Sequence, residues 1–308
     1  MRKVTFGATG LQVTPICFGG WQMGQTFWGK VPEKDLSEAV HVALEVGVNF
    51  FDTADAYGDG EGECILGRAL KGTVRDRFVI ATKVYHHFYP DGHRHPDLSA
   101  QYVLAECEAS LRRLQLDYLD LYLCHAFELS TPLQETAGAM EKLVRQGKVR
   151  AWGVSNFTLE QLRAMGTVGR VSAVQPYYNL LEADIEKDLL PYCQVEGLGV
   201  MVFSPLLRGL LTGKFKGTET FTDLRERDKR FQGETFRSLI AKVQKLRPIA
   251  QAKGCTVTQL SLAATIAHPA IQCAIVGIKN AEQVREAAGA ADVPLTREEY
   301  YKVRSALV

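Results

Sequence analysis

The sequence predicts a single (β/α)8 barrel over residues 1–308, with an N-terminal β-hairpin and C-terminal helices. Three observations favour this fold. Eight short apolar or β-branched runs alternate with amphipathic stretches of helical length, as parallel βα architectures require. No Pro-, Gly- or Ser-rich tract divides the chain as a linker would. Length alone would allow two domains, but single α/β barrels of this size are common.

The first eleven residues, with Gly7-Ala8-Thr9-Gly10, predict a hairpin that caps the bottom of the barrel. The apolar runs predict strands at 16–20, 48–52, 78–83, 119–124, 150–154, 173–175, 199–203 and 273–276. The stretches between them predict helices at 33–46, 61–71, 99–115, 132–147, 158–166, 184–196, 236–253 with 256–267, and 280–290. Residues 206–235 have no strand character and are rich in charge, so we interpret them as a solvated loop, with a functional lid as the alternative.

Composition places the chain among soluble globular proteins. Hydrophobic residues make up 46% and charged residues 23%, which excludes collagen-like, coiled-coil and disordered chains. Thirty-six basic against 35 acidic residues leave a net charge of +1. There is therefore no electrostatic case for a nucleic-acid partner, although a local anion site is possible.

The seven cysteines are scattered and form no CxxC pair, so we expect reduced thiols and a cytoplasmic location. Met1-Arg2-Lys3 leads into Val4-Thr5 and not into an apolar core, which argues against a signal peptide. No run of about 18 apolar residues occurs, so no membrane partner is expected. The sequence does not indicate an oligomeric state.

Polar residues stand at the ends of most predicted strands, where barrels of this kind build their active sites. These residues are Asp52 and Thr53, Thr82 and Lys83, His125, Ser155 and Asn156, Gln175 and Ser204. Taken singly, each has an ordinary structural explanation: an Asp after a strand usually caps the next helix, a Lys at a strand end usually extends its ammonium to solvent, and a His there is often a hydrogen-bonded core residue. Convergence on one rim favours a site, because burying Asp, Lys and His together costs several kcal/mol unless they pair or do chemistry.

An ion pair between Asp52 and Lys83 would place a positive charge near Tyr57. That charge favours the phenolate and is expected to lower the pKa of Tyr57 from about 10, which makes Tyr57 a usable proton donor. A neutral His125 beside it could donate a hydrogen bond to a carbonyl oxygen. This chemistry needs no metal, but reduction of a carbonyl requires a bound hydride carrier.

The sequence offers two candidate phosphate sites, the segments 204–214 and 277–283, and one glycine pattern that does not qualify. Gly58, Gly60 and Gly62 miss the spacing of a dinucleotide-binding GxGxxG and are interpreted as a turn. The segment 204–214 follows the seventh predicted strand, and 277–283 follows the eighth and opens a helix. Loops in these two positions bind phosphate in many barrels.

From Val4 to about residue 291 the chain resembles the aldo-keto reductases, a family of NAD(P)-dependent (β/α)8 oxidoreductases. The resemblance rests on Phe51-Asp52-Thr53-Ala54-x-x-Tyr57-Gly58, Thr82-Lys83, Leu119-Asp120-Leu121-Tyr122-x-x-His125, the segments 147–157 and 204–214, and Asn280-Ala281-Glu282-Gln283. It implies reduction of an aldehyde or ketone, with Tyr57 as general acid. Lys83 and Asp52 would tune Tyr57, and His125 would orient the carbonyl.

The resemblance also implies NADP as cofactor, with NADPH preferred over NADH, and a small carbonyl compound as substrate. Asn156 and Gln175 would hold the carboxamide, Phe203 would stack on the nicotinamide, and Lys279 would lie at the adenosine end. The full set of implied cofactor contacts is Gly20, Trp21, Asp52, Ser155, Asn156, Gln175, Phe203, Ser204, Leu206, Arg208, Gly209, Lys214, Gly277, Lys279, Gln283 and Glu286.

The chain departs from the family pattern at several positions. Phe203 stands where many relatives have Tyr or Trp, which keeps the stacking but loses a polar group. Ala287 replaces an Asn, and Gln283 replaces the Arg that some members use for the 2′-phosphate, so NADPH preference rests mainly on Lys279. Ala126-Phe127 replaces a frequent Trp-Pro, so the substrate wall does not carry over.

Four of the seven histidines, His86, His87, His93 and His95, follow the third predicted strand within ten residues. Such a tract can bind metal. Because Phe88 and Tyr89 accompany the histidines, we favour an aromatic wall facing the substrate or a solvated loop, and we expect no metal site.

Two other functions are consistent with these residues. The resemblance includes the potassium channel β subunits, so the chain could be a regulatory subunit that binds NADP(H) tightly and turns over slowly. A Schiff-base aldolase with Lys83 as nucleophile is a further alternative, which borohydride trapping would detect. Asp52, which would keep Lys83 charged, and the two phosphate-type loops argue against the aldolase.

Overall fold

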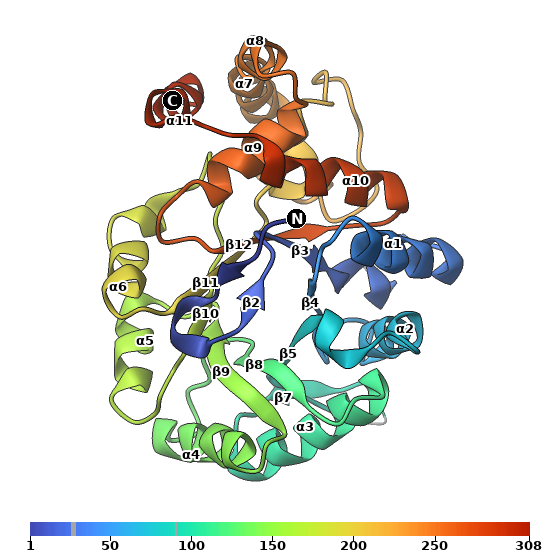
Figure 1. The fold of residues 1–308 in the computed structure, drawn as a ribbon, viewed down its shortest axis with the longest axis vertical. Helices are drawn as coiled ribbons and strands as arrows, with labels where there is room; N and C mark the ends of the chain where they lie inside the picture. The colour runs from blue at the N-terminus through green and yellow to red at the C-terminus, as the bar shows by residue number, and fades with distance from the viewer. Residues whose placement is uncertain (26–28, 90) are drawn as a thin grey trace.

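A closed parallel barrel forms the centre of the computed structural model, which describes residues 1–25, 29–89 and 91–308 (Figure 1). Its eight strands are hydrogen-bonded in the order β10-β11-β12-β3-β4-β5-β8-β9. They are β3 (Ile16–Gly19), β4 (Phe50–Asp52), β5 (Val79–Val84), β8 (Leu119–Cys124), β9 (Val149–Ser155), β10 (Ala173–Gln175), β11 (Gly199–Phe203) and β12 (Cys273–Gly277). Each predicted strand overlaps one of these, so the predicted fold class is confirmed.

Helices surround the barrel and lie against its outer face (Figure 1). They are α1 (Glu33–Glu45), α2 (Glu61–Leu70), α3 (Ala100–Leu114), α4 (Leu133–Arg145), α5 (Leu159–Gly166), α6 (Leu189–Val195), α9 (Val257–Ile266) and α10 (Ala281–Gly289). The core between this layer and the sheet is apolar and includes Phe18, Phe51 and Trp152. The strand carboxyl ends therefore all open at the same mouth of the barrel.

The predicted N-terminal hairpin closes the opposite end of the barrel. Strands β1 (Val4–Thr5) and β2 (Gln12–Val13) pair antiparallel and lie across the opening in Figure 1. Phe6, Leu11 and Val13 are buried in one cluster with inward-facing barrel residues such as Phe50. The fit is tight, because a Cβ at Gly199 would lie 2.7 Å from the Phe6 ring. The hairpin thus seals the bottom and leaves the mouth as the accessible end.

Asp120 ties three elements together at this sealed end. Its carboxylate accepts hydrogen bonds from Arg75 (2.6 Å), Arg150 (3.0 Å) and the backbone N–H of Ile80 (2.9 Å), and its side chain is 1% exposed. Because Asp120 is the second residue of β8, it lies far along the strand from the mouth. It is a structural group and not part of the site described below.

We expect Asp120→Ala to lower the free energy of unfolding by about 3 kcal/mol, because it leaves the buried Ile80 N–H and the partly exposed guanidiniums of Arg75 and Arg150 without their charged acceptor. Urea unfolding followed by circular dichroism measures this. Asp76→Ala, which removes a neighbouring exposed carboxylate, is the matched control. A loss below about 1 kcal/mol for Asp120→Ala would contradict the structural role.

A second apolar cluster carries the C-terminal helices beside the barrel. Helices α7 (Gly233–Gln244), α8 (Arg247–Ala252) and α11 (Arg297–Ala306) pack with α9 outside the main ring (Figure 1). The predicted single helix over 236–253 is wrong, because Pro248 lacks an N–H and its ring clashes with the turn before it. Helix α11 was not predicted by range, although its capping box of Thr296 and Glu299 is a readable signal.

The helix predicted over 184–196 is shorter in the structure. A 3-10 turn covers Asp184–Glu186, and α6 begins only at Leu189. Pro191 lies in the first turn of α6, where proline is tolerated, but it prevents the helix from extending toward its N-terminus.

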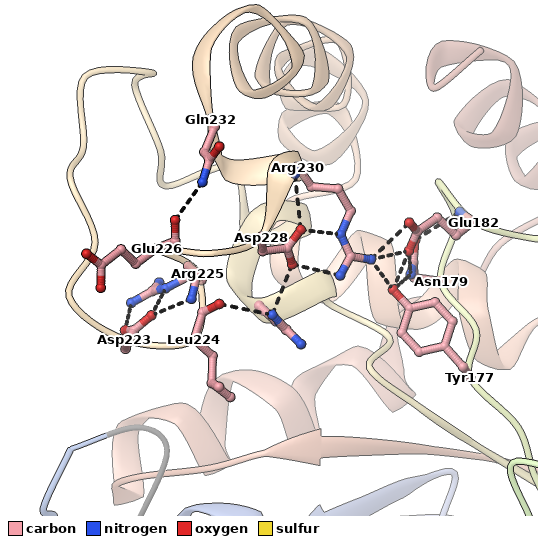
Figure 2. A network of polar contacts seen from close by, with 11 residues as sticks. Tyr177, Asn179, Glu182, Asp223, Leu224, Arg225, Glu226, Asp228, Arg230 and Gln232 are labelled. Carbon is pink, nitrogen blue, oxygen red and sulfur yellow. Dashed lines mark hydrogen bonds and ion pairs between the residues drawn. The ribbon is translucent and has the colours of Figure 1, made fainter.

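The segment 206–235 is packed and hydrogen-bonded, so its interpretation as a solvated loop is wrong. Phe215, Phe221, Phe231 and Phe236 lie with ring centroids 5.3–6.1 Å apart. Figure 2 shows the polar side of the segment: Arg230 contacts Asp228 (2.7 Å) and Glu182 (2.9 Å). Asp228 also pairs with Arg208 at 3.0 Å. These contacts hold the segment against the loop after β10.

The histidine-rich stretch after β5 forms a second hairpin. Strands β6 (His86–Phe88) and β7 (Arg94–Pro96) pair antiparallel, with His87 opposite His95 and Phe88 opposite Arg94. Asp91-Gly92 lies in its turn, a dipeptide that is a known hairpin signal. The predicted loop is therefore a folded element that stands beside the mouth of the barrel.

Within the described ranges, no helix is long and apolar enough to cross a membrane.

Candidate active site

Four polar side chains meet at the mouth of the barrel. The Lys83 ammonium lies 2.8 Å from Asp52 Oδ1 and 3.2 Å from the Tyr57 hydroxyl, and it donates to the Thr53 carbonyl at 2.7 Å. The Tyr57 and His125 rings meet edge to face, with centroids 6.1 Å apart. Asp52 ends β4, Lys83 lies near the end of β5, and His125 directly follows β8. Closure of the barrel therefore brings together Asp52 and His125, which are 73 positions apart in sequence.

Asp52 is held from its other side as well. Gln175 Nε2 donates to Asp52 Oδ2 at 2.8 Å, and Ser155 Oγ donates to the Gln175 carbonyl at 3.0 Å. Asn156, in the left-handed conformation with φ 56°, donates to the His125 carbonyl at 2.9 Å. The predicted rim residues of β9 and β10 therefore position the ion pair and the histidine.

Burial controls the ionisation of the pair. The Lys83 and Asp52 side chains are 0% and 3% exposed. Burial alone would lower the pKa of Lys83, but Asp52 and the Tyr57 oxygen favour the ammonium and raise the pKa above its ordinary value. Burial raises the pKa of Asp52, against the effect of Lys83. Lys83 is thus charged at neutral pH.

The expected lowering of the Tyr57 pKa is wrong. Burial raises the pKa of Tyr57, and this outweighs the opposing effect of the Lys83 charge. Asp52 adds to the rise, because its negative charge opposes a phenolate. Tyr57 is therefore a protonated phenol, with the cation beside it that would stabilise its anion.

His125 is neutral. Burial and the nearby Lys83 charge lower its pKa well below the ordinary value. Its Nδ1 is buried and has no hydrogen-bond partner among the described residues. A neutral imidazole keeps one N–H donor, and His125 lines the same cavity as Tyr57.

Glycines shape the loop that carries Tyr57. Gly58 and Gly60 have φ of 64° and 91°, and a Cβ at Gly58 would lie 2.4 Å from the Gly24 carbonyl oxygen. Gly62 N–H donates to the Tyr57 carbonyl at 2.9 Å as α2 begins. The interpretation of these glycines as a turn is confirmed. The close approach of this turn to Gly24 fixes the position of Tyr57.

A cavity of about 890 Å³ opens at this mouth. Most of the predicted positions line it: Trp21, Asp52, Tyr57, His125, Ser155, Asn156, Gln175, Phe203, Ser204, Leu206, Arg208, Gly209, Lys214, Gly277, Lys279, Gln283 and Glu286. Two do not. Lys83 is fully buried behind Asp52 and Tyr57, and Gly20 lies under the Asp52 carbonyl, where a Cβ would come within 2.9 Å.

The segment after β11 forms a cradle along the cavity. Ser204, Leu207 and Arg208 have positive φ values of 59°, 44° and 52°, followed by Gly209 at 91°. Left-handed backbone at non-glycine residues is costly and clusters at ligand sites. A Cβ on Gly209 would lie 3.3 Å from the Lys214 ammonium, so the glycine leaves the approach to that cation open.

Three cations gather at the far end of the cavity. Arg225 and Lys279 both lower the pKa of Lys214, after burial, and Arg225 lowers the pKa of Lys279. Such crowding disfavours each charge and favours an anion among them. Arg225 was missed in the sequence because it belongs to the segment 206–235, whose packing no local pattern indicates.

The side chains of α10 frame the same end. Asn280 caps the helix by accepting from the Gln283 N–H at 3.0 Å, and Gln283 Oε1 accepts from the Lys279 N–H at 2.9 Å. Glu286 accepts from the Thr256 hydroxyl at 2.9 Å. The helix N-terminus and Lys279 are thus presented together to the cavity.

The four histidines of the second hairpin divide between its faces, and among them only His86 lines the cavity. His87, His95 and Asp97 offer ligand atoms within 4.8 Å of one another. However, His87 Nδ1 is hydrogen-bonded to Asp97 at 3.0 Å, and its ring stacks on Tyr102 and His95 at 4.4 and 5.3 Å. These protein contacts account for the cluster, and the lack of a metal stays a prediction.

The fold and site together define a barrel whose mouth holds a buried Lys83–Asp52 ion pair, a tyrosine and a neutral histidine, beside a cavity lined by Lys214, Arg225 and Lys279. Residues 15–308 match the model of the aldo/keto reductase family. The chain belongs to this family and is an oxidoreductase acting on carbonyl or CH–OH groups. It is 36% identical to the aldo-keto reductase YhdN of Bacillus subtilis over 289 residues, 92% of this chain and 87% of that protein.

Other relatives carry different descriptions. A probable voltage-gated potassium channel subunit beta of Arabidopsis thaliana is 33% identical over 306 residues, 95% of this chain and 92% of that protein. The glycerol dehydrogenase AKR11B4 of Gluconobacter oxydans superposes with a TM-score of 0.92 at 32% identity, covering 99% and 95% of the two chains. An aldo-keto reductase from Klebsiella pneumoniae in complex with NADPH gives 0.78 at 35% identity, covering 99% and 95%.

Proposed function

We propose that the protein reduces a small aldehyde or ketone to the alcohol, using NADPH as hydride donor and Tyr57 as general acid. The observation that carries this is the fully buried Lys83 ammonium, 2.8 Å from Asp52 and 3.2 Å from the Tyr57 hydroxyl. Burial keeps Tyr57 protonated before reaction, and the Lys83 ammonium stabilises its phenolate afterwards.

In the proposed reaction, the substrate carbonyl oxygen lies between Tyr57 and His125. The neutral imidazole donates a hydrogen bond that polarises the carbonyl, and the Tyr57 hydroxyl gives its proton to the oxygen. Lys83 faces the resulting phenolate at hydrogen-bond distance, while Asp52 keeps Lys83 charged. Proton delivery is therefore the task of this chain's own residues.

NADP(H) fits the cavity as this chain builds it. When bound, the nicotinamide supplies the hydride that the protein lacks. Asn156, Gln175 and Phe203 would surround the carboxamide end, and the cradle from Ser204 to Gly209 would hold the pyrophosphate. Lys214, Arg225 and Lys279 suit a 2′-phosphate, which carries nearly two negative charges at pH 7.

Lys279→Ala is expected to weaken NADPH binding about tenfold to a hundredfold and to leave NADH binding nearly unchanged, because one charge-assisted contact to the 2′-phosphate is lost. Titration of both nucleotides by protein fluorescence measures this. Lys187→Ala, which removes an exposed lysine outside the cavity, is the control. An equal loss for both nucleotides, or none for either, would mean that another group reads the phosphate.

The pH dependence of kcat/KM follows from the same groups. His125 stays neutral because its pKa is lowered, and Tyr57 stays protonated because its pKa is raised above the ordinary value of about 10. We expect kcat/KM for carbonyl reduction to be flat from about pH 7 to about pH 9 and to fall only where the phenol ionises. A midpoint near pH 7.5 would show that a different group controls the rate.

A regulatory NADP(H)-binding subunit is the second candidate, favoured by the likeness to the plant channel β subunit. Such a protein would hold the nucleotide and turn over slowly. The complete set of Asp52, Tyr57, Lys83 and His125 supports an enzyme. Release of NADP⁺ faster than about once per second would exclude a regulatory subunit that holds its nucleotide and turns over slowly.

A panel of aldehydes, ketones and quinones tested with NADPH and NADH, read at 340 nm, tests the proposed function. We expect NADPH-dependent turnover of at least one carbonyl class. We further propose that residues 1–308 act as one domain and that the protein works in the cytoplasm.

A further inference from the structure

The hairpin β6–β7 forms the wall of the cavity beside Tyr57. His86 and Arg94 line the cavity here, together with Trp21, Ala56 and His125. Strand alternation explains which side chains face it: Phe88 pairs with Arg94, and His86 lies two residues before Phe88 on the same face. The hairpin follows β5 whereas Lys279 follows β12, and β3 and β4 separate these strands in the barrel, so a substrate, and not the adenosine end of a nucleotide, would lie at this wall.

Arg94 presents a guanidinium at this wall. The group lies over the Phe88 ring at 5.5 Å and contacts Asp59 at 3.4 Å, longer than a strong charge-assisted hydrogen bond. Both partners are about half exposed, and such pairs contribute little binding energy. Asp59 does not line the cavity. With five N–H donors, the guanidinium keeps the capacity to bind a second oxyanion from the cavity side.

His86 adds a second donor next to Arg94. Its backbone carbonyl is fixed by the Tyr102 hydroxyl, and its Nδ1 is buried without a hydrogen-bond partner among the described residues. Burial and the Arg94 charge lower the pKa of His86, so it is neutral near pH 7 and carries one N–H. A buried polar atom without a partner is costly unless a ligand or water satisfies it.

Arg94 is the cation among the described side chains that line this end. Asp52 is the carboxylate nearest to Tyr57 in the described lining, and Lys83 neutralises it. Glu282 and Glu286 lie at the other end, on α10. An oxyanion on the substrate would therefore meet Arg94 and His86 from the cavity side, with Asp59, which contacts Arg94 at 3.4 Å from outside the lining and acts to raise the pKa of His86, as the competing carboxylate.

We propose that the substrate is an aldehyde or ketone that carries an oxyanion, a carboxylate or a phosphate, which Arg94 binds and His86 assists. This rests on the proposed carbonyl reduction and names its substrate class. Arg94 acts in recognition and does not touch the reacting atoms, so its effect belongs in KM and in the choice between charged and uncharged substrates.

Matched substrate pairs test this with the full-length protein and NADPH. In 4-oxobutanoate against 4-methylpentanal, and 5-oxopentanoate against 5-methylhexanal, the carboxylate is replaced by an uncharged group of the same shape. Glyceraldehyde 3-phosphate against glyceraldehyde tests the phosphate. For wild type we expect kcat/KM at least about tenfold higher for the charged member of one pair, with the advantage shrinking at high salt.

Arg94→Gln should bring that ratio close to one, through a higher KM for the charged member, and leave the uncharged member within about twofold. Arg94→Lys should keep part of the preference. Arg112→Gln, an exposed arginine outside the cavity, should leave the ratio unchanged. NADPH affinity measured by fluorescence checks that the variants are folded.

Which pair shows the preference identifies the anion: the carboxylate pairs alone, or the phosphate pair alone. Equal kcat/KM within every pair for wild type, or a preference that survives Arg94→Gln, overturns the proposal while reduction of the uncharged members still supports carbonyl reduction. If no member of any pair oxidises NADPH, the proposed function itself fails.

Discussion

Replacing Tyr57 by Phe is expected to slow carbonyl reduction by about 10²- to 10⁴-fold, the usual contribution of a general acid. The ring remains, so packing against His125 persists, while the hydroxyl 3.2 Å from Lys83 is lost. NADPH affinity should stay within about twofold, because the phenol donates a proton and does not hold the nucleotide. Steady-state rates at 340 nm and fluorescence titration measure the two effects separately.

Tyr85→Phe is a matched control for this substitution. Tyr85 follows the same strand as Lys83, and its hydroxyl donates to the Phe127 carbonyl at 3.3 Å outside the lining of the cavity. Its loss should leave the rate nearly unchanged. Full activity in Tyr57→Phe would remove Tyr57 from the mechanism.

Replacing Lys83 by Met is expected to damage both stability and activity. It leaves the Asp52 carboxylate buried without its cation, which costs about 3–5 kcal/mol in comparable buried pairs. Activity should fall at least as far as in Tyr57→Phe, because nothing then stabilises the phenolate. Urea unfolding and turnover at 340 nm provide the two readouts.

The pH dependence of the Lys83→Met defect has a definite sign. Without Lys83, the pKa of Asp52 in the folded protein rises further above the unfolded value of about 3.9. Stability is then fully present below about pH 4 and is lost as pH rises toward the folded pKa. The deficit relative to wild type should therefore be larger at neutral pH than at acid pH.

The double variant Lys83→Met with Asp52→Asn separates the two roles of the pair. Replacing the carboxylate by an amide removes the unpaired charge, so most of the lost stability should return. Activity should not return, since the cation is still missing. Recovery of turnover in the double variant would contradict a catalytic role for Lys83.

The barrel, the order of its strands along the chain and the polar residues that meet at its mouth could all be predicted, because each depends on local patterns. The apolar runs ending in Asp52, Lys83 and His125 are short and separated by helical periodicity, and closure of the barrel brings those ends together. The hairpin at the bottom of the barrel could also be predicted, since Phe6, Leu11 and Val13 form an apolar face with a glycine turn. The meeting of these residues at one mouth followed from the parallel order of the barrel strands.

Features that depend on long-range packing could not be predicted in this way. Arg225 reaches the cavity because Arg208, Asp228 and Glu182 fix its segment, and these partners lie far apart in sequence (Figure 2). The pKa of Tyr57 depends on how completely it is buried, which residue types do not reveal. The hairpin β6–β7 was missed although Asp91-Gly92 is a local signal, because the histidines and aromatic residues favoured a substrate-facing wall or a solvated loop.

The fate of deuterium from NADPH that carries deuterium at both C4 positions tests the central claim most directly. The protein is incubated in H2O with the labelled nucleotide and an aldehyde that it turns over, and the alcohol is analysed by mass spectrometry. We predict one deuterium on the former carbonyl carbon of each alcohol, with many alcohols formed per protein molecule. Alcohol without deuterium, or no more than one alcohol per protein, would contradict catalytic hydride transfer from NADPH to a carbonyl at this site.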